Sequence, residues 1–336
     1  MSRLSRPALD ALARAAGLDA SRCAALLDAA GARPDAGEWR AALQRFAAVA
    51  GVLALGFGAV FFIAANWSAL TPNGRLGLLQ LLFVAAVAAA LWRPPPDPVG
   101  RGALLLAFIG AGALFALFGQ TFQTGADLHE LFALWALLGL PLVLAARWAA
   151  ASAAWLLVAN LALALFCGLM PAAHPLWLLF GFSDTDGTLR LLFAMAPNLL
   201  LWALAEWRAV RDPRLAAWLP RWLRRLLLLT GLGYGTVAAF IAIVDAESGR
   251  VATVSIFLLS AALVGVYCVQ VRREALGLVA LAASGILLGL AVLIEILQGS
   301  DAQLLLYPLW VLGASALAGT LLLPLVRRWE GEAHAD

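Results

Sequence analysis

Ten long apolar runs, separated by short polar segments, limit what this chain of 336 residues can fold into. Each run has about 17–25 residues, the length that a helix needs to cross the hydrocarbon core of a bilayer. The runs are too long for strands and lack period-two alternation, which excludes a transmembrane β-barrel. With 63% hydrophobic and 13% charged residues, the chain cannot hide its apolar side chains in one water-soluble core. We therefore predict an all-α, polytopic membrane helix bundle.

The predicted spans divide the chain into a small cytoplasmic helical cap over residues 1–45, a bundle over 46–326 and a cytoplasmic tail over 327–336. The ten spans are Phe46–Asn66, Leu76–Trp92, Gly102–Gly119, Glu130–Ala146, Ala149–Leu169, Leu189–Trp207, Arg225–Val244, Val251–Val269, Ala275–Leu297 and Leu304–Val326. In the cap, two short helices are expected to form a hairpin through an apolar seam of Leu9, Leu12, Leu26 and Leu27. The fourth and fifth spans are separated only by Arg147 and Trp148.

The arginines orient this arrangement. All 23 basic residues are arginine, and 20 of them fall on the same side as the N-terminus, leaving Arg75, Arg190 and Arg250 opposite. Because arginine and lysine accumulate in cytoplasmic loops, we expect both termini on the cytoplasmic side of the membrane. The net charge of only +3 gives no indication of a nucleic-acid partner.

The stretch 208–225 is the most basic part of the chain, and leucines and tryptophans alternate there with arginines. That pattern suits a helix in the headgroup layer. We expect contact with anionic lipid headgroups from Arg211, Arg214, Arg221, Arg224 and Arg225. The alternative is that these arginines only enforce the topology.

A polar segment, Phe118–Glu130, adjoins the third and fourth spans. One hypothesis makes it a solute or proton site at the outer mouth, formed by Gln120, Gln123, Asp127 and His129. The other is structural, because Asp127 followed three residues later by Glu130 is typical of a capping box at a helix start.

Near the middle of the predicted bilayer the chain has neutral polar groups and no ionisable ones. Asn160 and Asn198 are costly to leave unpaired in lipid, and Pro197 interrupts the backbone hydrogen bonding of its helix. These residues and Tyr234 are the candidate solute-lining groups. Glu295 is the only carboxylate well inside an apolar run, two residues from its end.

Small and aromatic residues mark helix contacts. The spacings Gly231–Gly235 and Gly285–Gly289 are expected to allow close packing. The tryptophans that lie away from the span ends are expected to pack between helices, and they are Trp135, Trp155, Trp202 and Trp310.

The chain shows no nucleophile with a visible base, no phosphate-binding loop and no spacing of metal ligands among its histidines and three cysteines. We therefore expect neither an enzyme nor a bound metal or cofactor.

Two stretches resemble a known family. The first span ends in Phe61-Phe62-Ile63-Ala64-Ala65-Asn66-Trp67, and the polar segment precedes Leu131-Phe132-Ala133-Leu134-Trp135-Ala136-Leu137-Leu138-Gly139-Leu140-Pro141. Over roughly Leu9 to Ala146 the chain is similar to the bacterial predicted membrane proteins of domain-of-unknown-function family 2157. The resemblance implies placement in the inner membrane of a bacterium, and it assigns no activity and no functional residue. Association of the family's relatives with other small membrane proteins implies a possible membrane protein partner.

Two functions remain open. A carrier of a small neutral or amphipathic solute is compatible with two halves of five spans each, because an odd number reverses orientation, although the halves share no matching Pro or Gly interruptions. The alternative is a non-catalytic subunit or scaffold of an envelope membrane complex, which suits the uncharged midplane.

Overall fold

The computed structural model describes residues 6–30, 36–66, 68–123, 125, 127–168, 185–212, 218–245 and 249–332. Within these ranges the chain forms helices and no strand, which confirms the all-α class. The helices are α1 (Arg6–Ala15), α2 (Ala20–Ala29), α3 (Ala36–Ala65), α4 (Pro72–Trp92), α5 (Pro98–Phe122), α6 (Leu128–Ala146), α7 (Ala149–Phe166), α9 (Thr185–Arg211), α11 (Arg221–Val244), α12 (Arg250–Val266), the π-helical turn η1 (Tyr267–Arg272), α13 (Ala275–Ile296) and α14 (Gln303–Glu332).

Nine helices in the described ranges are long and apolar enough to cross a membrane. They are α3 to α7, α11, α12 together with η1, α13 and α14. The remaining expected span, Leu189–Trp207, lies in α9, whose 27 residues give a length of about 40 Å. Arg190, Asn198 and Glu206 make α9 more polar than the nine, so its crossing of the membrane stays a prediction.

The boundary between the fourth and fifth spans lies where the sequence predicts it. Helix α6 ends at Ala146, Arg147 adopts a left-handed conformation with φ 44°, and α7 begins at Ala149. A single residue in this conformation reverses the chain direction after a helix.

The expected N-terminal hairpin of α1 and α2 forms, but the residues buried between its two helices differ in part from those predicted. Leu9 and Leu27 are buried as expected, but Leu12 is 53% exposed and Ala13 lies in the seam instead. Asp19 caps α2 by accepting a hydrogen bond from the backbone N–H of Arg22 at 2.8 Å, which holds the pKa of its carboxyl below the usual range.

Helix α3 begins at Ala36, ten residues before Phe46, so the first span and the end of the cap belong to one continuous helix.

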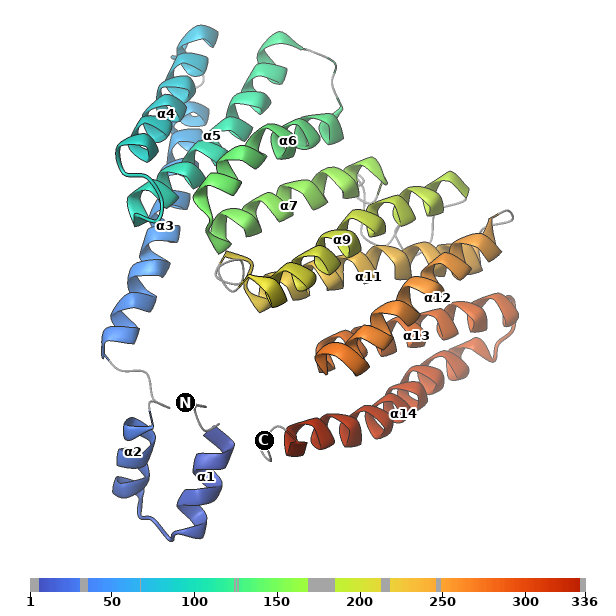
Figure 1. Ribbon diagram of the computed structural model, residues 1–336. Coiled ribbons are helices and arrows are strands. Elements are labelled where there is room, and N and C mark those ends of the chain that lie inside the picture. Colours follow the sequence, from blue (N-terminus) through green and yellow to red (C-terminus); the bar gives the residue numbers. More distant parts are fainter. Residues whose placement is uncertain are drawn as a thin grey trace.

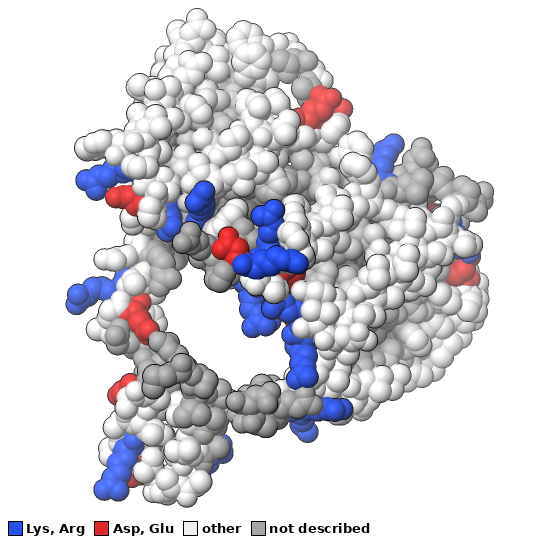
Figure 2. All heavy atoms as spheres, viewed as in Figure 1, with Lys and Arg blue, Asp and Glu red and all other residues white. Residues whose placement is uncertain are grey.

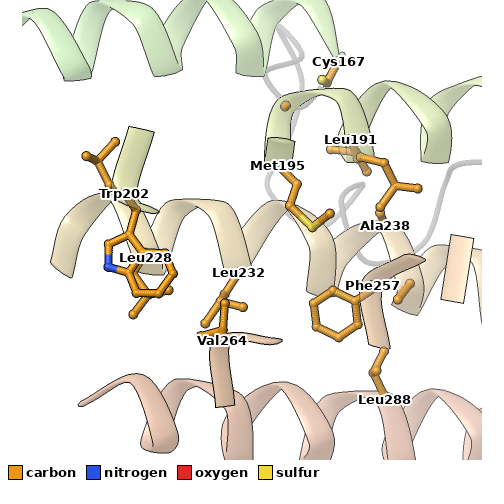
Figure 3. Packing of buried hydrophobic residues seen from close by; sticks show 14 of the residues in the cluster. Cys167, Leu191, Met195, Trp202, Leu228, Leu232, Ala238, Phe257, Val264 and Leu288 are labelled. Carbon is orange, nitrogen blue, oxygen red and sulfur yellow. The ribbon is translucent and has the colours of Figure 1, made fainter. Parts of the chain in front are cut away.

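Two central helices organise the bundle (Figure 1). In the first half, α5 contacts α3, α4, α6 and α7. In the second half, α11 contacts α9, α12 and α13, and 56% of its most apolar stretch is buried. Figure 3 shows how Met195, Leu232 and Phe257 converge from α9, α11 and α12 in the core of this half. In the first half the central helix α5 is the third of α3 to α7, whereas in the second half the central helix α11 comes second, after α9. The two halves are therefore packed differently.

Tryptophans connect successive helices through their indole N–H groups. Trp135 of α6 donates to the carbonyl of Phe108 in α5 at 2.8 Å. Trp155 of α7 donates to Ala136 of α6 at 2.8 Å, and Trp310 of α14 donates to Ile286 of α13 at 2.9 Å. The expected interhelical packing of these tryptophans is confirmed, as is that of Trp202, which is buried.

Glycines make room for these contacts. A Cβ at Gly112 would overlap the ring of Trp135, and one at Gly289 would overlap Trp310. Gly231 and Gly235 face Leu199 and Met195 of α9, which confirms the expected close approach, whereas Gly285 faces open space. Only one glycine of the 285–289 pair therefore serves a helix contact.

The helices alternate in direction. Arg250, which begins α12, donates to the carbonyl of Ala242 near the end of α11 at 3.1 Å and to Glu295 near the end of α13 at 3.1 Å. At the other end of these helices, Arg225 near the start of α11 pairs with Glu274 at the start of α13. Figure 1 shows the ends of α6 and α9 beside the starts of α7 and α11. We call the end that carries Arg147, Arg208 and Arg224 the arginine-rich end.

The contact between Gly112 and Trp135 predicts a specific loss of stability. Gly112→Ala should lower the free energy of unfolding by about 1–3 kcal/mol, the usual cost of overpacking a filled core. Gly110→Ala is the matched control, because a Cβ there meets no atom within 4 Å. Thermal unfolding in detergent, followed by circular dichroism, measures both variants. Equal midpoints would contradict the proposed packing role.

Candidate functional site

A hydrogen-bonded polar network joins α7, α9 and α11, and it contains three of the residues that the sequence singles out. Asn198 donates through Nδ2 to Oδ1 of Asn160 at 2.9 Å and to the carbonyl of Ala194 at 3.1 Å. The hydroxyl of Tyr234 donates to the carbonyl of Asn160 at 3.0 Å. Thr230, which sequence reasoning missed, donates to Oδ1 of Asn198 at 3.0 Å.

The network satisfies its own polar atoms. Asn160 also donates to the carbonyl of Leu156 at 3.0 Å, so the oxygen and nitrogen of both asparagine side chains have partners. Such a network holds helices together in an apolar environment. Pro197, next to Asn198, lies inside α9 without belonging to these hydrogen bonds.

The polar segment before α6 serves mainly to end and begin helices. Gln123 ends α5 in the left-handed conformation, with φ 46°. The backbone N–H of Asp127 donates to the carboxylate of Glu130 at 3.2 Å in a capping box, which confirms the structural interpretation of these two residues. His129 lies 4.0 Å from the carboxylate of Asp127, and its ring packs against Phe166 of α7. Thr124 and Ala126 lie outside the described residues.

A cavity of about 840 Å³ lies between the end of α5 and the start of α6. Gln120 and Glu130 are its polar lining residues, and the other lining residues are apolar or glycine. Gln120 is thus the one member of the expected outer-mouth site that lines this cavity, whereas Gln123, Asp127 and His129 do not line it.

Glu295 is tied into an ion pair at the end opposite the arginine-rich one. Its carboxylate lies 3.1 Å from Nη2 of Arg250 and accepts a second hydrogen bond from Gln298 at 3.3 Å. The pair joins the start of α12 to the end of α13 and leaves about a third of the Glu295 side chain exposed.

A buried ion-pair cluster occupies the arginine-rich end of the second half. Both carboxylate oxygens of Glu206 are engaged, at 3.0 Å from Nε of Arg224 and 3.0 Å from Nη2 of Arg272. The hydroxyl of Tyr267 lies 3.4 Å from the same carboxylate. Beside this group, Arg225 bonds Glu274 at 2.6 Å. Sequence reasoning missed this arrangement, because its partners come from four helix ends that are distant in the chain.

The five arginines expected to contact lipid are therefore in different environments. Arg224 is only 6% exposed, so its guanidinium is not available to a headgroup. Arg211 and Arg221 are exposed, and Arg211 stacks 4.2 Å from the ring centroid of Trp207. Arg225 is partly exposed beside Glu274, and Arg214 lies outside the described residues. Figure 2 shows arginines gathered near the middle of this face, while most of the surrounding surface is uncharged.

A second cavity, of about 410 Å³, lies at the arginine-rich end between the two halves of the bundle; we call it the seam cavity. Its size falls within the range of about 300–1,000 Å³ that is common for small-molecule sites. Its walls come from the end of α6, the start of α7, the end of α9, the start of α11 and the residues just before α11. The lining residues are Leu140, Val143, Leu144, Ser152, Trp155, Leu156, Leu201, Leu204, Ala205, Arg208, Trp218, Leu219 and Leu227.

The polar network lies at the deep side of the seam cavity. On each of the three helices, a leucine of the cavity lies three or four residues from a member of the network: Leu156 and Asn160, Leu201 and Asn198, Leu227 and Thr230. That spacing is about one helical turn, or about 5 Å along each axis. The candidate solute-lining residues Asn160, Asn198 and Tyr234 therefore lie beyond the cavity, toward the middle of the bundle, and are not among its lining residues.

No group of three His, Cys, Asp or Glu side chains suited to a metal ion occurs among the residues with described positions.

The resemblance found in the sequence is confirmed over the N-terminal part of the chain. The family model described as "Predicted membrane protein (DUF2157)" matches residues 10–152, which reach from α1 into the start of α7. No curated protein matches the chain, and no solved structure does. The protein is a membrane protein with several apolar helices. The matched region includes Ser152 of the seam cavity, while Arg208 and the cavity residues of α9 and α11 lie beyond it.

The burial of the Glu206 carboxylate leads us to expect a large loss of stability when its charge is removed. Glu206→Gln should destabilise the protein by about 3–5 kcal/mol, because it leaves the buried guanidinium of Arg224 without its counter-charge. Glu295→Gln is the control, and removing this partly exposed pair should cost about 1 kcal/mol or less. Unfolding midpoints in detergent compare the two. A smaller effect at Glu206 than at Glu295 would overturn the assignment of the cluster as a buried support.

Proposed function

We propose that this protein is a non-enzymatic carrier that binds a small amphipathic solute in the seam cavity and moves it across the membrane. The observation that supports the proposal is the position of the cavity, because it lies where α6 and α7 of the first half meet α9 and α11 of the second. Carriers commonly bind their solutes between two bundles that rock against each other.

In this proposal the polar network is the barrier that the solute must pass to cross the membrane. A solute in the seam cavity faces the hydrogen bonds that join Asn160 of α7 to Asn198 of α9. Moving toward the opposite end requires that these bonds open. Since neutral amides are cheaper to separate than a buried ion pair, a network without charges suits a barrier that must open and close.

Orientation and location belong to the same proposal. We place the arginine-rich end at the cytoplasmic face of a bacterial inner membrane, because positively charged residues accumulate on that side. The exposed Arg211 and Arg221 then lie at the level of anionic lipid headgroups. If α9 crosses the membrane together with the nine other helices, both termini are cytoplasmic.

This topology is tested by reporters at three positions. Alkaline phosphatase fused after residue 332 or inserted before α3 should be inactive, since the enzyme is active only outside the cytoplasm. The same reporter inserted after Asp245, between α11 and α12, should be active. Activity at the C-terminal position with inactivity after Asp245 would contradict the orientation.

A subunit or scaffold in an envelope complex remains the second candidate. The observation that favours it is the packing of α14, none of whose most apolar stretch is buried, and whose main contact is α13. A helix held on one side only has a free face for a helix of a membrane protein partner, although lipid covers such a face equally well.

The carrier proposal predicts that filling the seam cavity weakens binding of the solute. Ala205 is buried and lines the cavity, whereas Ala203 on the same helix is exposed. Ala205→Leu should weaken binding of radiolabelled laurate or dodecanol about tenfold or more, because the added side chain occupies the space of the solute. Ala203→Leu should bind as the wild type does. Equilibrium binding to protein in phosphatidylcholine nanodiscs, corrected with empty nanodiscs, measures each variant.

Two outcomes would count against this proposal. Equal binding by both alanine variants would place the solute elsewhere. The scaffold would be favoured by two results together. The wild-type protein would bind no solute, and a stoichiometric protein partner would stay bound in mild detergent but be lost from the variant Leu312→Trp in α14.

A further inference from the structure

The chemistry of the seam cavity is almost wholly apolar, with one exception. Its polar side chains other than the tryptophan indoles are Ser152 and Arg208. Ser152 donates to the carbonyl of Trp148 in its own helix at 3.2 Å. The indole N–H of Trp155 is bonded to Ala136. Among the described lining residues, Arg208 is therefore the one with a formal charge, in a cavity whose other walls are mainly apolar.

Arg208 forms no ion pair with a residue whose position is described, although the carboxyl-bearing Asp212 lies four residues further along the chain. Glu206 is two residues away, but its carboxylate is engaged by Arg224 and Arg272, each at 3.0 Å. Glu274, the other buried carboxylate at this end, is bonded to Arg225. The guanidinium of Arg208 instead stacks on its neighbour Trp207, 5.4 Å from the ring centroid.

The surroundings of Arg208 also carry an excess of positive charge. The buried cluster joins three arginines to two glutamates, so it has a net charge of +1 before Arg208 is added. Within it, Nη1 of Arg224 is buried and has no hydrogen-bond acceptor among the described residues, while Nε of the same side chain lies 3.0 Å from the carboxylate of Glu206. Arg224 lies one turn before Leu227, a wall residue of the cavity. Arg208 itself is exposed, and an excess of positive charge beside apolar walls favours an anion placed there.

We infer that the seam cavity takes a single apolar chain with an anionic headgroup, a carboxylate or a phosphate, and that Arg208 binds the headgroup. The inference rests on the proposed binding function and narrows its solute to one class. A guanidinium binds both oxygens of a carboxylate or phosphate with parallel hydrogen bonds, which gives strength and orientation. The cavity volume of about 410 Å³ lies toward the lower end of the usual range for ligand sites and suits one chain, not the two chains of a phospholipid.

The geometry offers a matched pair of variants. Arg208 and Arg211 both stack on Trp207, at 5.4 and 4.2 Å from its centroid, but only Arg208 lines the cavity. Arg208→Gln and Arg211→Gln remove the same charge from the same helix end. Arg208→Lys keeps the charge and loses the paired hydrogen bonds. The probes are laurate, dodecyl phosphate and dodecanol, at a pH where the carboxyl is ionised, with protein in phosphatidylcholine nanodiscs.

The wild-type protein should bind laurate and dodecyl phosphate at least about tenfold more tightly than dodecanol, as expected for a hydrogen bond to a charged group. Arg208→Gln should remove this preference, because it should weaken the binding of laurate and dodecyl phosphate much more than the binding of dodecanol. Arg211→Gln should keep the preference, and Arg208→Lys should keep part of it. Inorganic phosphate alone should not displace laurate, because it lacks the apolar chain.

Several results would overturn the inference. If dodecanol binds the wild type as tightly as laurate, or if Arg208→Gln and Arg211→Gln behave alike, the charge of Arg208 does not select the solute, although the proposed binding function survives. If phosphatidylglycerol added to the nanodiscs displaces laurate at low mole fraction, the occupant is a two-chain membrane lipid. If no amphiphile binds the wild type, the proposed function itself fails.

Discussion

Every polar group that this protein places among apolar helices needs a partner inside the protein, because the lipid offers none. The demand is greatest at Glu206, a carboxylate buried at the end of α9. Arg224 from α11 and Arg272 from η1 both approach it within 3.0 Å, so one side chain holds three helix ends together. The π-helical turn at the end of α12 supplies both Tyr267 and Arg272 to this carboxylate, in keeping with the frequent use of such turns at special sites.

The same constraint explains where the seam cavity lies and what remains free in it. Glu206 is occupied by two arginines, and Asn160 and Asn198 are occupied by each other and by the backbone. Arg208 is left at the cavity without an ion pair to any described residue. Among the described residues, Arg208 thus brings a charge without an ion pair to the place where the two halves join, which suits the binding of an amphipathic anion.

Much of the fold could be predicted from local patterns. Apolar runs locate the nine helices that qualify as spans, and the spacing of Asp127 and Glu130 predicts the start of α6. The interhelical positions of Trp135, Trp155 and Trp310 follow from their distance from the span ends. Predictions that depended on orientation around a helix axis were less successful. Leu12 in the hairpin is exposed, and Arg224, expected at the lipid, is buried, because a rotation of about 100° per residue separates the faces of a helix.

The candidate site was predicted only in part, because the sequence does not specify which faces of the helices meet. Asn160, Asn198 and Tyr234 do come together, because unpaired amides in lipid are costly enough to specify helix partners. The sequence did not predict that this network lies next to a cavity or that Arg208 lines that cavity. Both features depend on which turns of α7, α9 and α11 face each other. No local pattern records that information.

The sequence by itself determined the class of the protein, because the free energy of moving an apolar run into lipid depends on its composition and length alone. It also predicts an alternation of charge between the two ends, since each arginine belongs to a particular segment between spans. The tertiary structure decided which carboxylate pairs with which guanidinium and where space remains between the halves. These outcomes depend on distances between side chains of different helices, such as Arg225 and Glu274, which are 49 residues apart, and only the packing of the helices sets those distances.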